Sequence, residues 1–181
     1  MQLAPRDGGR GLEGNVVEAA IRSLQTRPDP ALQHQVDARV AQLASRQPRG
    51  NSGFEVAVAY FQATGRRDLL DPSIATADAL GAGFAARNPP FNRGERDAIN
   101  CIQLFRATGN AKHLDLAKHY LDIRGLETSV DRSRQNQSYM PVIEQSEAVG
   151  HAVNCTSLLV SLLDVGVLTG LEPYAAAACR M

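Results

Sequence analysis

Three side chains in the stretch EQSEAVGHAV have the types and spacing to bind a polar ligand: Glu144, Glu147 and His151. We expect a helix from about Glu144 to Leu168, on which they fall at positions i, i+3 and i+7 of one face. A neutral imidazole donates from one ring nitrogen and accepts at the other, which suits vicinal hydroxyl groups. The pattern makes His151 a candidate for binding hydroxyls and Glu147 a candidate for orienting its ring. Two alternatives stay open: the glutamates favour the positive end of the helix, or His151 is a satisfied core residue.

A second candidate segment precedes this stretch, because residues 126–142 form the longest polar part of the chain, with RSRQNQSY at its centre. A loop of this length in a compact helical domain is usually functional or mobile. Amide groups and an aromatic ring suit sugars, so Gln137 and Tyr139 are predicted to rim a carbohydrate site. A solvated loop is the equal alternative. Arg132 and Arg134 are two charges and do not make a nucleic-acid patch.

The cysteines do not have the spacing of a metal site or a redox pair. Cys101, Cys155 and Cys179 are odd in number, far apart and without a C-x-x-C pair. We expect buried thiols that pack as small hydrophobic side chains, and we assign no metal ligand. The remaining histidines are expected at the surface, because charged residues flank them: His34, His113 and His119.

Composition excludes several classes of partner. Nineteen basic residues balance nineteen acidic ones, so long-range attraction to nucleic acid or to an anionic membrane is absent. We find no apolar run of transmembrane length and expect no membrane-spanning helix. The first residues lack the apolar stretch of a secretory signal, and the compartment stays unknown. The hydrophobic content of 44% is enough for a packed core.

The elements that must position these residues are helices, because helical spacing of apolar residues recurs and strand-like alternation is almost absent. Residues 1–13 are expected to be irregular, and a loop is expected over Gly81–Arg93. Pro72 fits only in the first turn of its helix. The predicted helices are Gly14–Gln25, Pro30–Arg46, Phe54–Thr64, Arg67–Leu80, Ala98–Thr108, a partner containing Leu114–Leu121, Glu144–Leu168 and a last one from Glu172.

One unit of the sequence repeats. AYFQATGRRDLLDPSIATAD is echoed by QLFRATGNAKHLDLAKHYLD, and VGVLTGLEPYAAAACR is a weaker third copy. Each copy predicts a helix, a turn at Gly65, Gly109 or Gly170, and a returning helix. A helical hairpin cannot bury its apolar face alone, so neighbouring hairpins must stack. The uneven spacing of the copies favours a toroid with loop insertions over an open solenoid.

The stretch MPVIEQSEAVGHAV, with the hairpins before it, resembles glycoside hydrolase family 127, the β-L-arabinofuranosidase type, over residues 14–181 in family order. The resemblance implies an all-α fold of helical hairpins forming part of an (α/α)6 toroid. It implies an arabinofuranoside-type carbohydrate as ligand and retaining hydrolysis. The family's nucleophile is a cysteine in a zinc–thiolate site, and a glutamate is its acid/base. In the family these groups follow the point where this sequence ends.

We therefore expect a partial domain over residues 14–181, truncated at its C-terminus, with no catalytic residue and no bound zinc of its own. The sequence departs from the family at Phe54, where the family usually has histidine, and at Tyr139, where a nearby histidine is usual. Only His151 matches a pocket histidine. The chain is expected to be inactive alone and to self-associate through exposed helix faces. A non-catalytic helical scaffold or binding module is the alternative function.

Overall fold

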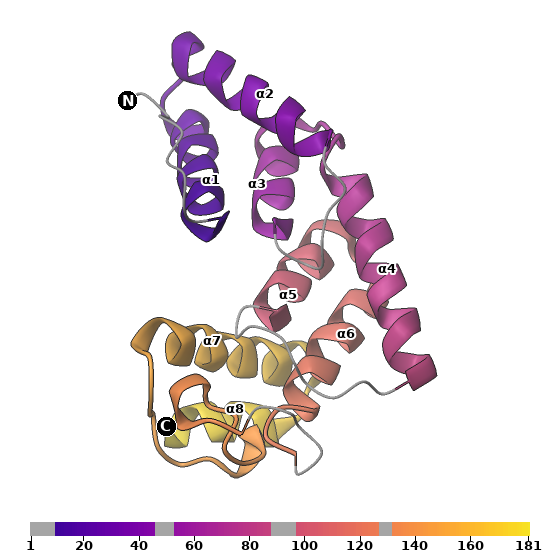
Figure 1. Ribbon diagram of the computed structural model, residues 1–181, viewed down its shortest axis with the longest axis vertical. Helices are drawn as coiled ribbons and strands as arrows, with labels where there is room; N and C mark the ends of the chain where they lie inside the picture. Colours follow the sequence, from indigo (N-terminus) through magenta and orange to yellow (C-terminus); the bar gives the residue numbers. More distant parts are fainter. Residues whose placement is uncertain (1–9, 46–52, 88–96, 127–131) are drawn as a thin grey trace. The chain divides into compact units, whose positions relative to one another are not determined.

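The computed structural model describes residues 10–45, 53–87, 97–126 and 132–181, and these contain helices, turns and irregular segments with no strand (Figure 1). The predicted all-α fold is confirmed. The helices are α1 (Arg10–Thr26), α2 (Pro30–Ala44), α3 (Phe54–Thr64), α4 (Leu70–Arg87), α5 (Asp97–Thr108), α6 (Ala111–Asp122), α7 (Ala152–Thr169) and α8 (Glu172–Arg180), with short 3-10 helices η1 (Arg134–Asn136) and η2 (Val142–Glu144). The chain divides into two compact units, Met1–Ala77 and Asp78–Met181.

The start of the first helix and the end of α4 differ from those predicted. The first helix begins at Arg10, inside the segment expected to be irregular. Helix α4 continues through Gly81 to Arg87, because glycine lowers helix propensity by only ~1 kcal/mol and does not end a helix by itself. Pro72 lies in the first turn of α4, as predicted. The rest of the loop predicted over Gly81–Arg93, residues 88–93, lies outside the described residues.

The first unit has its core between α1, α2 and α3. Its buried residues are Val17, Ala20, Ile21, Val36, Val40, Val56, Ala59 and Tyr60. The start of α2 is fixed by Asp29, whose carboxylate accepts hydrogen bonds from the amides of Ala31 and Leu32 at 3.0 and 3.1 Å. Such an N-cap contributes ~1 kcal/mol, and Pro30 follows it where no backbone donor is needed.

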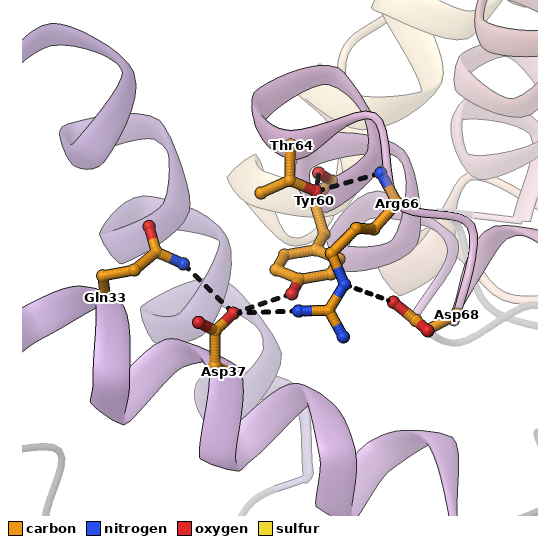
Figure 2. Close-up of polar contacts among 6 residues, drawn as sticks. All are labelled: Gln33, Asp37, Tyr60, Thr64, Arg66 and Asp68. Atoms are coloured by element: carbon orange, nitrogen blue, oxygen red, sulfur yellow. Dashed lines mark hydrogen bonds and ion pairs between the residues drawn. The ribbon is translucent and has the colours of Figure 1, made fainter.

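A polar cluster joins α2 to α3 in this unit (Figure 2). The buried Tyr60 donates its hydroxyl hydrogen to Asp37 Oδ1 at 2.7 Å, and Gln33 donates to the same oxygen at 3.1 Å. Arg66 lies 3.6 Å from this oxygen and over the Tyr60 ring. The Tyr60 hydroxyl holds the pKa of Asp37 below its ordinary value. Burial, with the carboxylate beside it, raises the pKa of Tyr60 to about 12.

The repeated Thr-Gly turns have the same hydrogen bonds in all three copies. The Thr108 hydroxyl donates to the carbonyl of Leu104 at 2.8 Å and accepts from the amide of Asn110 at 3.2 Å. Thr64 and Thr169 make the corresponding two bonds. The glycine that follows each threonine is left-handed, with φ of 73° at Gly65, 69° at Gly109 and 72° at Gly170. The repeat is therefore a side-chain-supported helix end.

The second unit contains the part of α4 from Asp78 onward and two stacked hairpins, α5 with α6 and α7 with α8, and α7 also packs against α5 and α6. Arg106 of α5 pairs with Asp164 of α7 at 2.8 Å. The hydroxyl of Tyr174 in α8 donates to Asp122 at the end of α6. These polar contacts fix which faces of the two hairpins meet.

The placement of the histidines differs from the prediction at His113. Its side chain has 1% exposure, although charged residues flank it in the sequence. His119 is half-buried, with its ring 4.8 Å from that of Phe84. Helix α6 turns both rings toward α4 or α5, so the neighbours in sequence do not decide their exposure. His34 is exposed, as predicted.

We expected no membrane-spanning helix, and helix α7 is nevertheless long and apolar enough to cross a membrane by length and composition alone. Core helices of soluble proteins pass the same test, and one such helix is weak evidence. Part of α7 is buried against its neighbours. Five large apolar side chains of α7 are exposed: Val153, Val160, Leu163, Val167 and Leu168.

Candidate functional site

The segment 133–151 has a fixed backbone because two buried carboxamides bond to its carbonyls. Gln145 donates from Nε2 to the carbonyl oxygens of Gln137 and Met140, at 2.9 and 2.8 Å. Gln137 donates to the carbonyl of Val149. Both glutamine side chains are fully buried. The described part of the segment is thus a structured loop with an internal polar frame.

The end of α6 is attached to the same segment. The buried Arg124 donates from its guanidinium to the carbonyl of Asn136 at 2.6 Å. Gly125 is left-handed, and a Cβ at that position would overlap the carbonyl group of Met140. The loop therefore lies directly against the backbone that ends α6.

The helix predicted from Glu144 begins only at Ala152, so Glu144, Glu147 and His151 do not share a helix face. The reason lies in contacts across the loop. The backbone amide of His151 donates a hydrogen bond to the carbonyl of Gln135 at 3.0 Å. This amide therefore does not make the hydrogen bond that a residue inside a helix would make. Gly150 is left-handed and packed so closely against the carbonyls of residues 134 and 135 that a Cβ would overlap them. The helix starts after this contact, with His151 at its N-cap position.

We use the name Arg134 cluster for Arg134, the two residues that its side chain contacts, Tyr139 and Glu147, and His151, whose backbone amide bonds to the carbonyl of Gln135. The guanidinium of Arg134 pairs with Glu147 at 2.9 Å and lies over the Tyr139 ring, 4.7 Å from its centroid. The side chain of His151 is exposed, and its backbone is bonded beside Arg134. The partner that Glu147 has among the described contacts is Arg134, and the predicted orienting role toward His151 finds no support there.

Sequence reasoning missed Arg134 and Gln145. The sequence indicates for Arg134 only that it makes no nucleic-acid patch, and its spacing to Tyr139 gives no signal because the two meet only through the turn at η1. Gln137 was predicted to touch a sugar, but its side chain is fully buried and supports the loop. Glu144 is exposed at the end of η2, outside the Arg134 cluster.

The described residues do not fit a zinc site. Among them no group of three or more histidine, cysteine, aspartate or glutamate side chains could hold a metal ion. Cys101 and Cys155 are buried and Cys179 is exposed, all three as free thiols. Burial raises the pKa of Cys155, which disfavours the reactive thiolate. We therefore assign no chemical step to a metal in this part of the chain.

A family model described as the β-L-arabinofuranosidase GH127 catalytic domain matches residues 51–180, which include the whole Arg134 cluster. A non-reducing end β-L-arabinofuranosidase from Bifidobacterium longum subsp. longum is 26% identical to 64% of this chain, and the match covers 21% of that protein. The chain thus spans about a fifth of the length of this curated relative.

Two solved structures share the fold. A GH127 β-arabinofuranosidase superposes with a TM-score of 0.77 at 26% identity, covering 99% of this chain and 35% of the other. The GH127 β-L-arabinofuranosidase Ara127N from Geobacillus stearothermophilus T6 superposes with a TM-score of 0.77 at 23% identity, covering 98% of this chain and 36% of the other. The chain corresponds to about a third of each of these structures.

Proposed function

This chain belongs to glycoside hydrolase family 127, the family of β-L-arabinofuranosidase catalytic domains, and we propose that its Arg134 cluster binds the arabinofuranosyl group of a glycoside. The observation that carries the proposal is that half-buried Tyr139 and exposed Glu147 and His151 belong to one loop whose backbone is held by buried hydrogen bonds. A furanose offers hydroxyl groups in a fixed arrangement, and a loop that does not move meets them without an ordering cost.

Each member of the cluster has a role suited to a sugar. The His151 ring donates from one nitrogen and accepts at the other. Glu147 accepts two hydroxyl hydrogens once Arg134 has fixed its carboxylate. The Tyr139 ring offers a flat apolar face to the carbon–hydrogen side of the sugar. Gln137 and Gln145 contribute indirectly by holding the carbonyls of the loop in place.

We also propose that the whole enzyme cleaves terminal arabinofuranosyl groups with retention, and that residues 1–181 alone do not. Glycoside cleavage needs a nucleophile or a positioned water on one side of the anomeric carbon and an acid at the leaving oxygen. In the described residues, Glu147 is the exposed acid nearest His151 in the loop, but it is paired with Arg134. Buried Cys101 and Cys155 are not placed to attack a sugar.

Binding is tested by titrating the 181-residue chain with methyl β-L-arabinofuranoside while recording backbone amide shifts by NMR. Shifts should concentrate in residues 133–151. His151→Ala should weaken binding ~3–10-fold, the effect of losing one or two hydrogen bonds. His34→Ala is the matched control, since His34 is an exposed histidine on α2, and it should bind normally. Equal effects of the two substitutions would contradict the proposed site.

Cleavage is tested separately with an aryl β-L-arabinofuranoside, with and without added zinc. The 181-residue chain should show no turnover above background in either condition. Turnover that disappears in Cys155→Ala would contradict this part of the proposal, because it would mean that the chain forms its own thiolate site. The binding part would stand or fall independently.

The second candidate function is a non-catalytic helical module, and the observation that favours it is the exposed apolar side of α7. An apolar surface of this kind is typical of a protein–protein contact. A chain that associates through α7 but causes no amide shifts with the arabinofuranoside would support this alternative over sugar binding.

A further inference from the structure

Within the second unit, α4 meets α6 and α6 meets α8 at equivalent positions of the repeat. Asp78 and Asp122 align in the repeated sequence, each on the returning helix of its copy. His113 and Tyr174 are likewise equivalent, each in the first turn or so after its Thr-Gly turn. In space, Asp122 meets Tyr174, and Asp78 lies nearest to His113, with 3.8 Å between Oδ1 and Nε2. The same pair of repeat positions therefore meets twice, as aspartate with tyrosine in one place and as aspartate with histidine in the other.

The Asp122–Tyr174 junction is closed at neutral pH. A phenol keeps its proton far above neutrality, and burial raises the pKa of Tyr174 further. Its hydroxyl donates to Asp122 Oδ1, while Lys118 pairs with Oδ2 at 2.6 Å. The contact between α6 and α8 thus needs no change of protonation.

At the Asp78–His113 junction, no hydrogen lies between the two side chains while the His113 ring is neutral. The hydroxyl of Thr108 donates its hydrogen to the carbonyl of Leu104 at 2.8 Å, so its oxygen is an acceptor toward His113 Nδ1, 3.1 Å away. Nδ1 must then carry the ring hydrogen, which leaves Nε2 with a lone pair. Nε2 is buried without a hydrogen-bond partner and faces a carboxylate oxygen. Two acceptors face each other across this gap.

We propose that Asp78 and His113 form a proton-operated latch between α4 and α6, open while the ring is neutral and closed when His113 takes up a proton from solvent at Nε2. The imidazolium then donates from Nε2 to Asp78 Oδ1, and the bond reproduces the one that Tyr174 makes permanently to Asp122. No covalent bond changes, and the proton returns to solvent when the pH rises. Asp78 is half-exposed, so its side chain is free to move toward the ring.

The surroundings decide when the latch closes. Burial is the largest influence and lowers the pKa of His113, Asp78 acts to raise it, and Lys112 acts to lower it. Thr108, from α5, is neutral and holds the other ring nitrogen. The latch therefore closes below the ordinary pKa of a histidine, in mildly acidic surroundings.

The test is long-range proton–nitrogen NMR of the histidine rings in the 181-residue chain, titrated from mildly alkaline to acidic buffer. His113 should hold its hydrogen on Nδ1 at high pH and gain an exchange-protected hydrogen on Nε2 at low pH. Asp78→Asn should weaken proton binding at His113 several-fold. Asp122→Asn, at the equivalent junction, should leave the His113 titration unchanged. A neutral ring with its hydrogen on Nε2, or an unchanged titration in Asp78→Asn, would overturn the proposal.

A second variant replaces His113 by tyrosine, the residue at the equivalent position of the Asp122–Tyr174 junction. His113→Tyr should supply a permanent donor to Asp78. The protection of the α4 amides near Asp78, measured as the exchange rate relative to the intrinsic rate at the same pH, should then no longer rise on acidification as it does in the unaltered chain. Protection in this variant that still rises on acidification would count against the latch. If His113→Tyr does not fold, the Asp78→Asn titration decides alone.

Discussion

At the residue scale, the loop of the candidate site depends on a glycine that no other residue can replace. Gly150 combines a left-handed φ of 75° with direct packing against the carbonyls of residues 134 and 135. The backbone at this point carries His151, so the conformation of one glycine decides where the histidine lies. Gly65 has a similar φ of 73° but open space around it. A larger residue at Gly65 would meet only the strain of the left-handed conformation, whereas at Gly150 it would meet this strain and steric overlap.

We predict a graded effect of alanine at three glycines. Gly150→Ala should destabilise the fold by roughly 3 kcal/mol or more, because strain and overlap add. Gly65→Ala should cost only ~1–2 kcal/mol, the strain of the left-handed conformation. Gly81→Ala, in helix α4 with open space around it, should stabilise the protein by about 0.5–1 kcal/mol. Urea unfolding of the three variants measures the order, and equal losses at Gly150 and Gly65 would contradict the close packing.

At the element scale, α2 and α3 are joined by a hydrogen bond whose two partners titrate far apart. The folded pKa of Asp37 is below its model-compound value of 3.8, and that of Tyr60 is about 12 against 10.0. The stability contributed by Asp37 is present above pH 3.8 and is lost as pH falls through its folded pKa. The contribution of Tyr60 is present below pH 10.0 and is lost as pH rises through about 12.

We therefore predict that the free energy of unfolding falls at both extremes of pH and that Tyr60→Phe flattens the alkaline fall. The substitution keeps the buried ring but removes the titrating hydroxyl and the bond to Asp37. The measurement is urea unfolding at a series of pH values. Tyr139→Phe, which alters a tyrosine outside this cluster, should leave the alkaline fall in place.

The helices were predictable wherever their ends have local causes. Asp29 with Pro30 begins α2, and a threonine with its glycine ends α3, α5 and α7, so these boundaries follow from neighbouring residues. The start of α7 was not predictable, because it is set by bonds from residues 137 and 151 to distant carbonyls. The burial of His113 was missed for the same reason. The resemblance to the family indicated His151 as a binding residue. The contact between Arg134 and Tyr139 depends on a turn at η1 that the sequence does not predict.

At the scale of the whole molecule, the exposed apolar side of α7 is the surface through which we expect copies of the chain to associate. Val153, Val160, Leu163 and Val167 are exposed on a helix whose single charged residue, Asp164, is paired with Arg106. Two such surfaces bring no like charges together when they meet, and both lose apolar contact with water.

We predict that the 181-residue chain self-associates as its concentration rises and that Val160→Glu with Val167→Glu suppresses this. Sedimentation velocity measures the effect. Val16→Glu is the control, because Val16 is an exposed valine on α1, and this variant should associate like the unaltered chain. Suppression by the control, or none by the α7 variant, would place the contact elsewhere.

The loop backbone is held by uncharged side chains, and this has a consequence for how the candidate site responds to ionic strength. Gln137 and Gln145 hold the backbone through uncharged, buried groups, which salt does not screen. The Arg134–Glu147 pair is different, since its side chains are 59% and 65% exposed, and salt weakens such a pair. Concentrated salt should therefore weaken the contact between the Arg134 guanidinium and the Glu147 carboxylate, while the backbone of the loop keeps its conformation. A neutral sugar would then find the same scaffold with more mobile charged side chains, and its affinity should vary far less with salt than that of a charged ligand.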